Sequence, residues 1–259
     1  MKWTLTPDRF ALAWEHTGGD RIPYPLAVRL TARDTDERAA QLPELTAWRE
    51  RDLDPDLQAA LRVLAHPVIR VEVYGEQGCG ASALPVRILG AVSGEVMVVA
   101  AQRPHVRPDR GDDVRIFAGH AATLAARVVS LLPEYPAGTG PRFTAPVERV
   151  LEDSRDLVTV PVSGPTTSAR MRRLLRQPRE GIGQIVVSVR LGAGDTEPQP
   201  IGVLCWIDVT DDGRYAVRTR TEVDMVPVTA ESFTEALRPL ITAAERTVTD
   251  RLVAEHTEY

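Results

Sequence analysis

The strongest chemical pattern in the chain is a short glycine-rich run. Gly78-Cys-Gly-Ala-Ser-Ala83 has the G-x-G-x-x-A spacing with which dinucleotide-binding proteins hold a pyrophosphate after a strand. That chemistry requires a helix directly after the run, because N–H groups at the helix N-terminus bind the phosphate. Here the chain continues as Ala83-Leu-Pro-Val-Arg-Ile-Leu89, which is typical of a strand, and the run lacks the lysine of a P-loop. We therefore interpret the run as a hairpin loop.

Other reactive side chains lack the partners that catalysis would need. Cys79 would act as a nucleophile only beside a base, and the sequence places none there. Asp211 and Asp212 precede a glycine and indicate a hairpin turn. The histidines have no metal-ligand spacing; they are His16, His66, His105, His120 and His256. We predict no catalytic, cofactor-binding or metal-binding residue, and keep a small-ligand or nucleotide-binding enzyme that uses the Gly75–Ser82 loop as the alternative.

Arginine is almost the only basic residue, and it gathers in two places. The first set comprises Arg170, Arg172, Arg173, Arg176 and Arg179. No aromatic residues interleave with this set to stack on bases, so a solvated helix face is favoured over a nucleic-acid site. The net charge of −5 and the pI near 5.6 agree, because they provide no general attraction for nucleic acid. Nucleic acid is therefore not an expected partner.

The second arginine set lies at strand spacing. Arg214, Arg218 and Arg220 alternate along one predicted strand, and Trp206 and Asp208 alternate along the strand before it. Together they predict a polar, partly aromatic sheet face. An ordinary exposed face and a protein-binding platform explain this pattern equally well.

The elements that carry these residues occur twice. Arg62 to Pro67 closes a helix and precedes a strand-like run, Val68–Tyr74; Arg173 to Pro178 precedes a second run, Gln184–Leu191. A hairpin, a short strand and a helix follow each run, and the last helix starts near Thr229. The predicted fold is therefore α+β, a pseudo-two-fold duplicated helix–β-meander–helix unit with a central, mostly antiparallel β-sheet flanked by two helical bundles. We expect halves at 1–135 and 136–259 that form one composite domain.

The sequence also predicts the compartment. No apolar run is long enough to span a bilayer, and the N-terminus lacks the pattern of a signal peptide. The two cysteines, Cys79 and Cys205, fall one in each half and are expected to be free thiols. We predict a soluble, cytoplasmic protein with no membrane partner. The residue usage, rich in Arg, Ala, Val, Pro and Asp, resembles that of actinobacterial proteins.

Several segments, taken in order, resemble one family. A Trp-Thr-Leu-Thr strand at residues 3–6 is followed by Ile22-Pro-Tyr-Pro-Leu26, by a helix that ends at His66-Pro67, and by Ile207-Asp-Val-Thr-Asp-Asp-Gly-Arg-Tyr215. Over essentially the whole chain, this order is similar to the EspG family of ESX (type VII) secretion-associated proteins. The Asp-x-x-x-x-Gly-Arg-Tyr hairpin is the most characteristic part.

The resemblance implies an ATP-independent cytosolic chaperone that is not an enzyme. It implies that the chain binds the helical tip of a PPE-type subunit, keeps the PE–PPE pair soluble and targets it for export; a related WXG-type partner and a homodimer stay open. By position, the family's client loop corresponds to Gly75, Glu76, Gln77, Gly78, Cys79, Gly80, Ala81 and Ser82. The adjacent sheet, with Trp206, Arg214 and Arg218, and the C-terminal bundle from Ala230 on correspond to its other contact region.

Overall fold

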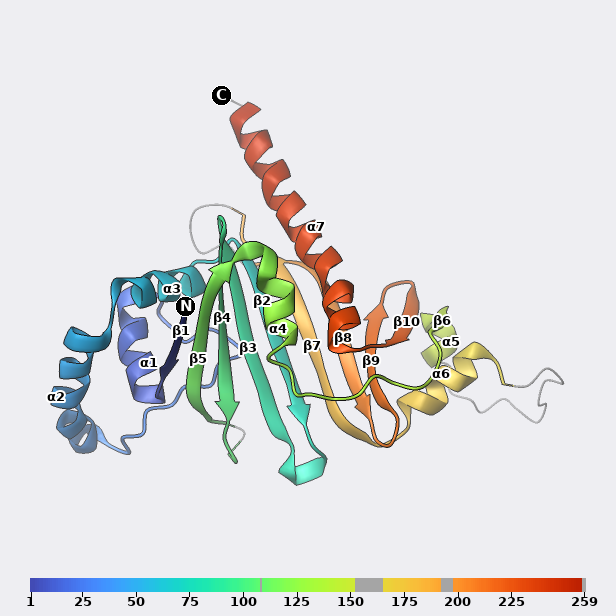
Figure 1. Ribbon diagram of the computed structural model, residues 1–259, viewed down its shortest axis with the longest axis horizontal. Helices are drawn as coiled ribbons and strands as arrows, with labels where there is room; N and C mark the ends of the chain where they lie inside the picture. The colour runs from blue at the N-terminus through green and yellow to red at the C-terminus, as the bar shows by residue number, and fades with distance from the viewer. Residues whose placement is uncertain (108, 152–164, 192–197, 258–259) are drawn as a thin grey trace.

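A single antiparallel sheet runs through the molecule. The computed structural model describes residues 1–107, 109–151, 165–191 and 198–257. Ten strands lie in the order β1-β5-β4-β3-β2-β7-β8-β9-β10-β6 (Figure 1). They are β1 (Lys2–Leu5), β2 (Ile69–Gln77), β3 (Leu84–Ser93), β4 (Val96–Pro104), β5 (Gly111–His120), β6 (Phe143–Pro146), β7 (Arg179–Val189), β8 (Gln199–Val209), β9 (Gly213–Thr219) and β10 (Glu222–Pro227).

The strand order confirms the predicted duplication. Outward from the centre it reads β2-β3-β4-β5-β1 on one side and β7-β8-β9-β10-β6 on the other, so each half contributes an equivalent meander closed by its own first strand. The halves join where β2 pairs antiparallel with β7, from Ile69↔Val189 to Gln77↔Gly181. A pseudo-two-fold axis therefore passes between these two strands. The boundary at residues 135/136 remains a prediction.

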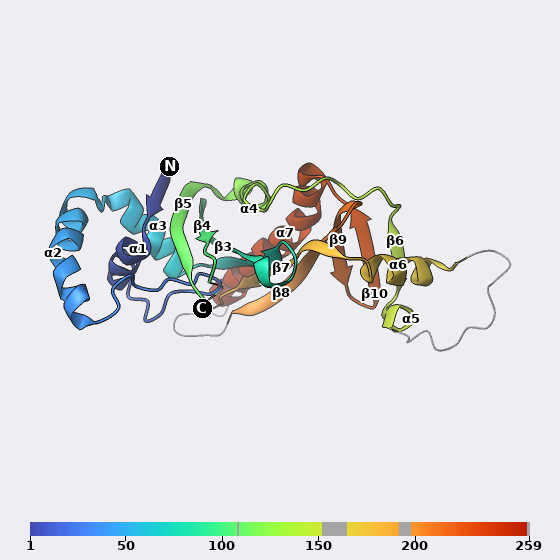
Figure 2. The same ribbon diagram turned by 90° about the horizontal axis from the view of Figure 1, so that it is seen from below.

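Helices gather at both ends of the sheet and across one of its faces. Three helices lie at the β3–β5 end. Helices α1 (Pro7–Trp14) and α3 (Pro55–Ala65) pack on these strands, and α2 (Thr35–Asp52) packs on α1. Two short helices, α5 (Val147–Leu151) and α6 (Thr167–Leu175), lie near β6 and β10 at the other end (Figure 2). Helices α4 (Leu124–Val129) and α7 (Ala230–Thr257) pack on each other and on the central strands, and the C-terminal part of α7 projects past the sheet (Figure 1).

The alternation of side chains along each strand gives the sheet two distinct faces. One face carries Val71, Ile185 and Trp206, which share a core with α4 and α7; we call it the α4/α7 face. The other carries Leu89 and Ile116 beneath α1–α3, and Ile207 beside α6 at the far end; we call it the bundle face. Three apolar cores therefore form, one on the first face and two at the ends of the second.

Local sequence signals fix the helix ends. Asp54 caps α3, because its carboxylate accepts a hydrogen bond from the Leu57 N–H at 2.7 Å, and Pro55 occupies the first helical position. Thr6 caps α1 in the same way, and Pro7 follows it. Pro239 lies inside α7, which is assigned as one continuous helix from Ala230 to Thr257.

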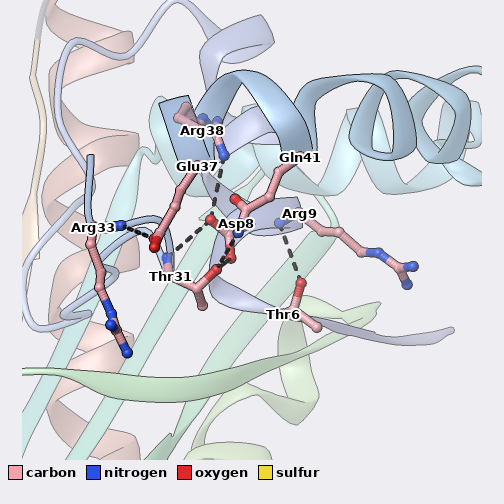
Figure 3. Close-up of polar contacts among 8 residues, drawn as sticks. All are labelled: Thr6, Asp8, Arg9, Thr31, Arg33, Glu37, Arg38 and Gln41. Atoms are coloured by element: carbon pink, nitrogen blue, oxygen red, sulfur yellow. Dashed lines mark hydrogen bonds and ion pairs between the residues drawn. The ribbon is translucent and has the colours of Figure 1, made fainter. Parts of the chain in front are cut away.

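A buried carboxylate attaches α2 to α1 (Figure 3). Asp8 accepts hydrogen bonds from the backbone N–H of Thr31 at 3.1 Å and from its hydroxyl at 2.6 Å, and it pairs with Arg38 at 3.3 Å. Glu37 accepts a further bond from the N–H of Arg33 at 2.7 Å. Because these partners satisfy the charge of Asp8, its burial is a structural device that positions the N-terminal helices.

Candidate functional site

A groove opens at the centre of the bundle face, between the two sets of end helices. Its volume is about 520 Å³. The residues that line it are Tyr74, Gly75, Glu76, Leu175, Arg179, Ile182, Gly183, Gln184, Cys205, Trp206, Ile207 and Val217. We call this feature the central groove. Because it lies beside the β2–β7 pair, both halves of the chain build it.

The strand register explains the floor of the central groove. One cross-strand row runs from Tyr74 through Gln184 and Cys205 to Val217, and a parallel row contains Ile182 and Ile207. These side chains are mostly apolar and sit on the face opposite the α4/α7 core. On α6, Leu175 supplies one wall. The floor is thus an apolar surface that a partner can reach.

Two aliphatic side chains on this face are exposed beyond what a closed core would allow. Ile182 is 42% exposed, and Val203, on β8 one row beyond Cys205, is 40% exposed. The N-terminal helices contact β3, β4 and β5, while α6 contacts β6, so these central strands lie between the bundles. An apolar strip of this kind, rimmed by polar residues, is typical of a site that binds a protein segment or a ligand.

An aromatic pair forms the rim on the N-terminal side. The Tyr24 ring lies 5.7 Å from the Tyr74 ring, centroid to centroid, and Arg70 donates a hydrogen bond to the Tyr24 carbonyl at 2.9 Å. Arg70 also pairs with Glu72 at 2.8 Å, so its charge is compensated. Burial and the nearby Tyr74 and Glu72 raise the pKa of Tyr24, so its phenol is neutral at physiological pH.

The predicted client loop lies at one end of the groove and is partly strand. Residues Gly75, Glu76 and Gln77 belong to β2, and Gly75 and Glu76 line the groove. The rest of the segment (Gly78, Cys79, Gly80, Ala81 and Ser82) is exposed and includes a single 3₁₀ turn, η2 (Gly80–Ser82). Strand β3 follows directly, so the helix that a dinucleotide site needs is replaced by a strand, as predicted.

Hydrogen bonds hold this loop against the start of β7. The Gly78 N–H donates to the Glu180 carbonyl at 2.6 Å, and the Cys79 thiol donates to the Arg179 carbonyl at 3.2 Å. Arg179 in turn donates from its guanidinium to the Leu175 carbonyl at the end of α6 at 2.5 Å. The loop, the groove wall and β7 are therefore linked through Arg179.

The predicted exposed platform at Trp206 and Arg214 is wrong. Trp206 is 1% exposed; its indole lies on the α4/α7 face over Gly75 and Gly183, where no side chain blocks it. Arg214 is 6% exposed and donates two hydrogen bonds to Asp208, at 2.6 and 2.8 Å. These residues and Arg218 do share a face, as predicted. Helix α7 packs on that face, and the segment between α4 and β6 (residues 130–142), which we call the connector, hydrogen-bonds to the backbone of Arg214 through Pro136 and Gly138. Alternation along a strand cannot reveal either contact.

The connector is locked by a second polar network. Asp212 accepts hydrogen bonds from the N–H and hydroxyl of Thr139, both at 2.7 Å, and from the Tyr215 hydroxyl at 2.7 Å. Burial alone would raise the pKa of Asp212, but these hydrogen bonds outweigh burial and lower it. Burial and the bond to Asp212 raise the pKa of Tyr215 to about 12. The characteristic Gly-Arg-Tyr hairpin is therefore a structural element.

The side chains that line the groove include one thiol, that of Cys205. Burial raises the pKa of the Cys205 thiol on the floor, which makes it a poor nucleophile at neutral pH. Both cysteines are free, and the described part of the chain holds no group of three or more potential metal-ligating side chains. The sequence prediction missed Tyr24, Leu175, Ile182, Gln184 and Val217. Only the alternation of small and apolar residues around Ile182, flanked by two glycines, indicated an unusual strand face.

A duplicated sheet with helical ends and an open, apolar centre defines a binding scaffold, and the comparisons assign its family. The EspG family model matches residues 6–238, so the chain belongs to the EspG family. The chain also resembles the Mycobacterium tuberculosis type VII secretion system chaperone EspG5, solved in complex with a PE25–PPE41 dimer. The TM-score is 0.61 and the identity 14%, over 97% of this chain and 96% of that one.

No curated protein matches the sequence. Among the described residues, none of the helices is both long and apolar enough to cross a membrane. The structural likeness establishes the fold, which confirms the predicted α+β pseudo-two-fold architecture.

Proposed function

We propose that this protein is a cytoplasmic chaperone of a type VII secretion system. It binds a helical PE/PPE-type or WXG-like substrate, keeps it soluble and delivers it for export, and it has no enzymatic activity. The observation that carries the proposal is the open apolar groove at the centre of an EspG-family fold. The related EspG5 was solved with a helical PE25–PPE41 dimer bound, which supports a client of the same kind.

The groove suits the end of a helical hairpin. Amphipathic helices bind in apolar grooves through a few anchoring side chains, and a 520 Å³ site is large enough for such anchors. Ile182 and Val203 would bury their exposed apolar surface against the client, at about 25 cal/mol per Å² before the cost of association. Glu76, Gln184 and Arg179 lie among the apolar residues and would orient the client by polar contacts.

The loop Gly75–Ser82 is part of the proposed site. Its first residues line the groove, and its exposed tip stands where a client that fills the groove would extend. Arg218 lies on the opposite face of the sheet from the groove floor, because it follows Val217 directly in an extended strand. We therefore remove Arg218 from the proposed client surface. We also remove Arg214 and Trp206, because they are only 6% and 1% exposed; Trp206 borders the groove, but its ring packs on the α4/α7 side over Gly75 and Gly183. The loop is retained.

Co-expression tests the proposal. The chain should form a stable complex with one of the PE/PPE-like or WXG-type pairs from its own source, as judged by co-purification and size-exclusion chromatography. Ile182→Arg and Val203→Arg should each weaken this complex at least tenfold, because Ile182→Arg places a charge in the apolar groove and Val203→Arg places one on the apolar strip beside it.

A matched variant controls for general effects of a surface charge. Val96 is 46% exposed at the start of β4, away from the groove, so Val96→Arg should leave client affinity unchanged. Circular dichroism and thermal melts must show all three variants folded. If folded Ile182→Arg and Val203→Arg bind clients as well as the Val96→Arg control, the groove is not the client site. If no candidate pair binds the wild-type chain, the proposed function itself fails.

A further inference from the structure

A second cleft lies on the α4/α7 face, near the outer edge of the C-terminal half. It consists of two adjoining pockets of about 260 and 240 Å³, which share Arg142, Arg218 and Asp224. The inner pocket runs under the first turns of α7 and is mainly apolar, with Leu204, Val226 and Pro239 in its lining. The outer pocket is polar and adds Arg220 and Thr144. We call the two together the arginine cleft.

The strand register places the arginine cleft behind the sheet from the central groove. Thr144 pairs with Asp224, and Asp224 pairs with Arg218, so the three side chains form one row across β6, β10 and β9. Val217 precedes Arg218 and lines the central groove instead. Because successive side chains of a strand point to opposite faces, the cleft stays open when a client occupies the groove.

The cleft carries positive charge that its own acids do not neutralise. Asp224 is fully engaged: it accepts two hydrogen bonds from Arg142, at 2.9 and 2.8 Å, and one from the Thr144 hydroxyl at 2.9 Å. No ion pair joins Arg218 or Arg220 to Glu222, the cleft's other acid, or to any further carboxylate in the described part of the chain. The cleft therefore holds three arginines against two acids, a local excess of positive charge in a chain whose net charge is −5.

Arg218 is held in place before any partner arrives. It is half-buried, and one of its terminal amino groups donates to the Ala236 carbonyl of α7 at 2.7 Å, whereas its buried Nε has no acceptor. A partly desolvated cation without an anion is unfavourable, so an incoming carboxylate would recover part of that cost. A fixed guanidinium also recognises carboxylates with little loss of side-chain entropy.

We propose that the arginine cleft is a second protein-binding site, which takes an acidic and aliphatic peptide segment. A carboxylate of the segment pairs with Arg218 and Arg220, and a neighbouring aliphatic side chain enters the inner pocket beside Leu204 and Pro239. Nucleic acid fits less well, because the lining has no aromatic ring for a base and contains two acids. A partner bound here would contact the chaperone while the central groove is filled.

Fluorescence anisotropy with labelled peptides tests the proposal. The probe is a fluorescein-labelled peptide of alternating aspartate and leucine; the comparison probes replace leucine by serine, or aspartate by asparagine, and a fourth is a single-stranded oligonucleotide. The wild-type protein should bind the Asp/Leu probe most tightly and lose affinity as salt rises. Arg220→Glu should weaken binding at least tenfold, because it places a repelling charge at an exposed position. The Arg220 side chain makes no hydrogen bond or ion pair with the described residues, so the change should not unfold the protein.

The control variant is Arg62→Glu, an equal charge change at an exposed arginine on α3. It should bind the Asp/Leu probe like the wild type, and adding a client bound in the central groove should not displace the probe. Equal weakening by Arg62→Glu would show a nonspecific charge effect and overturn the proposal. Tighter binding of the oligonucleotide or of the serine probe, or no measurable binding of the Asp/Leu probe, would overturn it as well. Displacement of the probe by a groove-bound client would also contradict the proposal; only this last measurement requires a client, and the others do not depend on whether a client binds the groove.

Discussion

At the residue scale, the Asp208–Arg214 ion pair is the contact in the second half where we expect a single substitution to destabilise the protein strongly, because both side chains are buried. The side chains are 2% and 7% exposed, and two charge-assisted hydrogen bonds join them. Removing one partner leaves a buried charge without compensation, whereas replacing both by apolar residues removes the problem. The pair therefore specifies how the β8–β9 hairpin packs more than it adds to stability.

We expect Arg214→Met to lower the free energy of unfolding by about 3–5 kcal/mol, because Asp208 is left buried and unpaired. The double variant Asp208→Leu with Arg214→Met should recover most of that loss. Urea unfolding followed by tryptophan fluorescence measures both.

Arg142→Met provides the matched control for this prediction. Arg142 also makes two hydrogen bonds to an aspartate, Asp224, but its side chain is 65% exposed. Its loss should cost less than about 1 kcal/mol, as for other solvent-exposed ion pairs. The prediction is contradicted if Arg214→Met is no more destabilising than Arg142→Met. If Arg214→Met is strongly destabilising, a loss of client binding in that variant would reflect unfolding and would not place Arg214 in the client site.

At the element scale, two glycines in neighbouring strands make room for one indole. A Cβ atom at Gly183 would lie 2.1 Å from the Trp206 ring, and one at Gly75 would lie 2.7 Å from it and 2.4 Å from the Ile182 carbonyl. The β2–β7 pair and β8 can pack only because both glycines lack side chains on the α4/α7 face. The floor of the central groove, on the opposite face of the same strands, depends on this packing.

Gly183→Ala should therefore destabilise the protein by about 1–3 kcal/mol through overpacking. In Trp206→Leu the obstructing ring is absent, so the same glycine change should cost much less. A double-mutant cycle by thermal or urea unfolding measures the coupling. Additive effects of the two changes would show that the close approach of Gly183 and Trp206 does not constrain the sheet.

The strands also show how far sequence could predict this fold. Alternation along β8 correctly separated Leu204, Trp206 and Asp208 from Cys205 and Ile207, because the side-chain period of a strand is fixed. It could not say which face is covered, since that depends on α7 and the connector docking from distant parts of the chain. The central groove escaped prediction for the same reason: its floor exists only once β2 pairs with β7, more than a hundred residues away.

At the scale of the whole molecule, the sheet is nearly symmetric and the surroundings are not. The strand order repeats outward from the β2–β7 pair, yet α4 has 6 residues and its counterpart α7 has 28. The N-terminal half carries three helices on the bundle face, with an 18-residue α2, whereas α5 and α6 are short. The symmetric central strands of both halves form the shared core on the α4/α7 face. The unequal helices around the sheet leave the central groove and the arginine cleft open.

The halves share this core and should not fold apart. Val71 and Val73 from the first half and Ile185, Val187 and Leu237 from the second belong to one apolar cluster, and α4 packs on α7 across the boundary. Separation would expose that cluster and leave β2 and β7 as unpaired edge strands, which promotes aggregation. We therefore expect fragments 1–135 and 136–259 to be insoluble or non-cooperative when expressed alone.

Expressed together, the two fragments should assemble into a one-to-one complex that melts cooperatively, because the β2–β7 pairing and the shared core need no covalent link. Size-exclusion chromatography and thermal melts measure this. Val71 is fully buried in the shared core, so Val71→Asp in the first fragment should abolish assembly. Val96→Asp in the same fragment, at the exposed first residue of β4, should not. A fragment that melts cooperatively by itself would show two independent domains instead of one composite domain, and the boundary at residues 135/136 would then separate folding units.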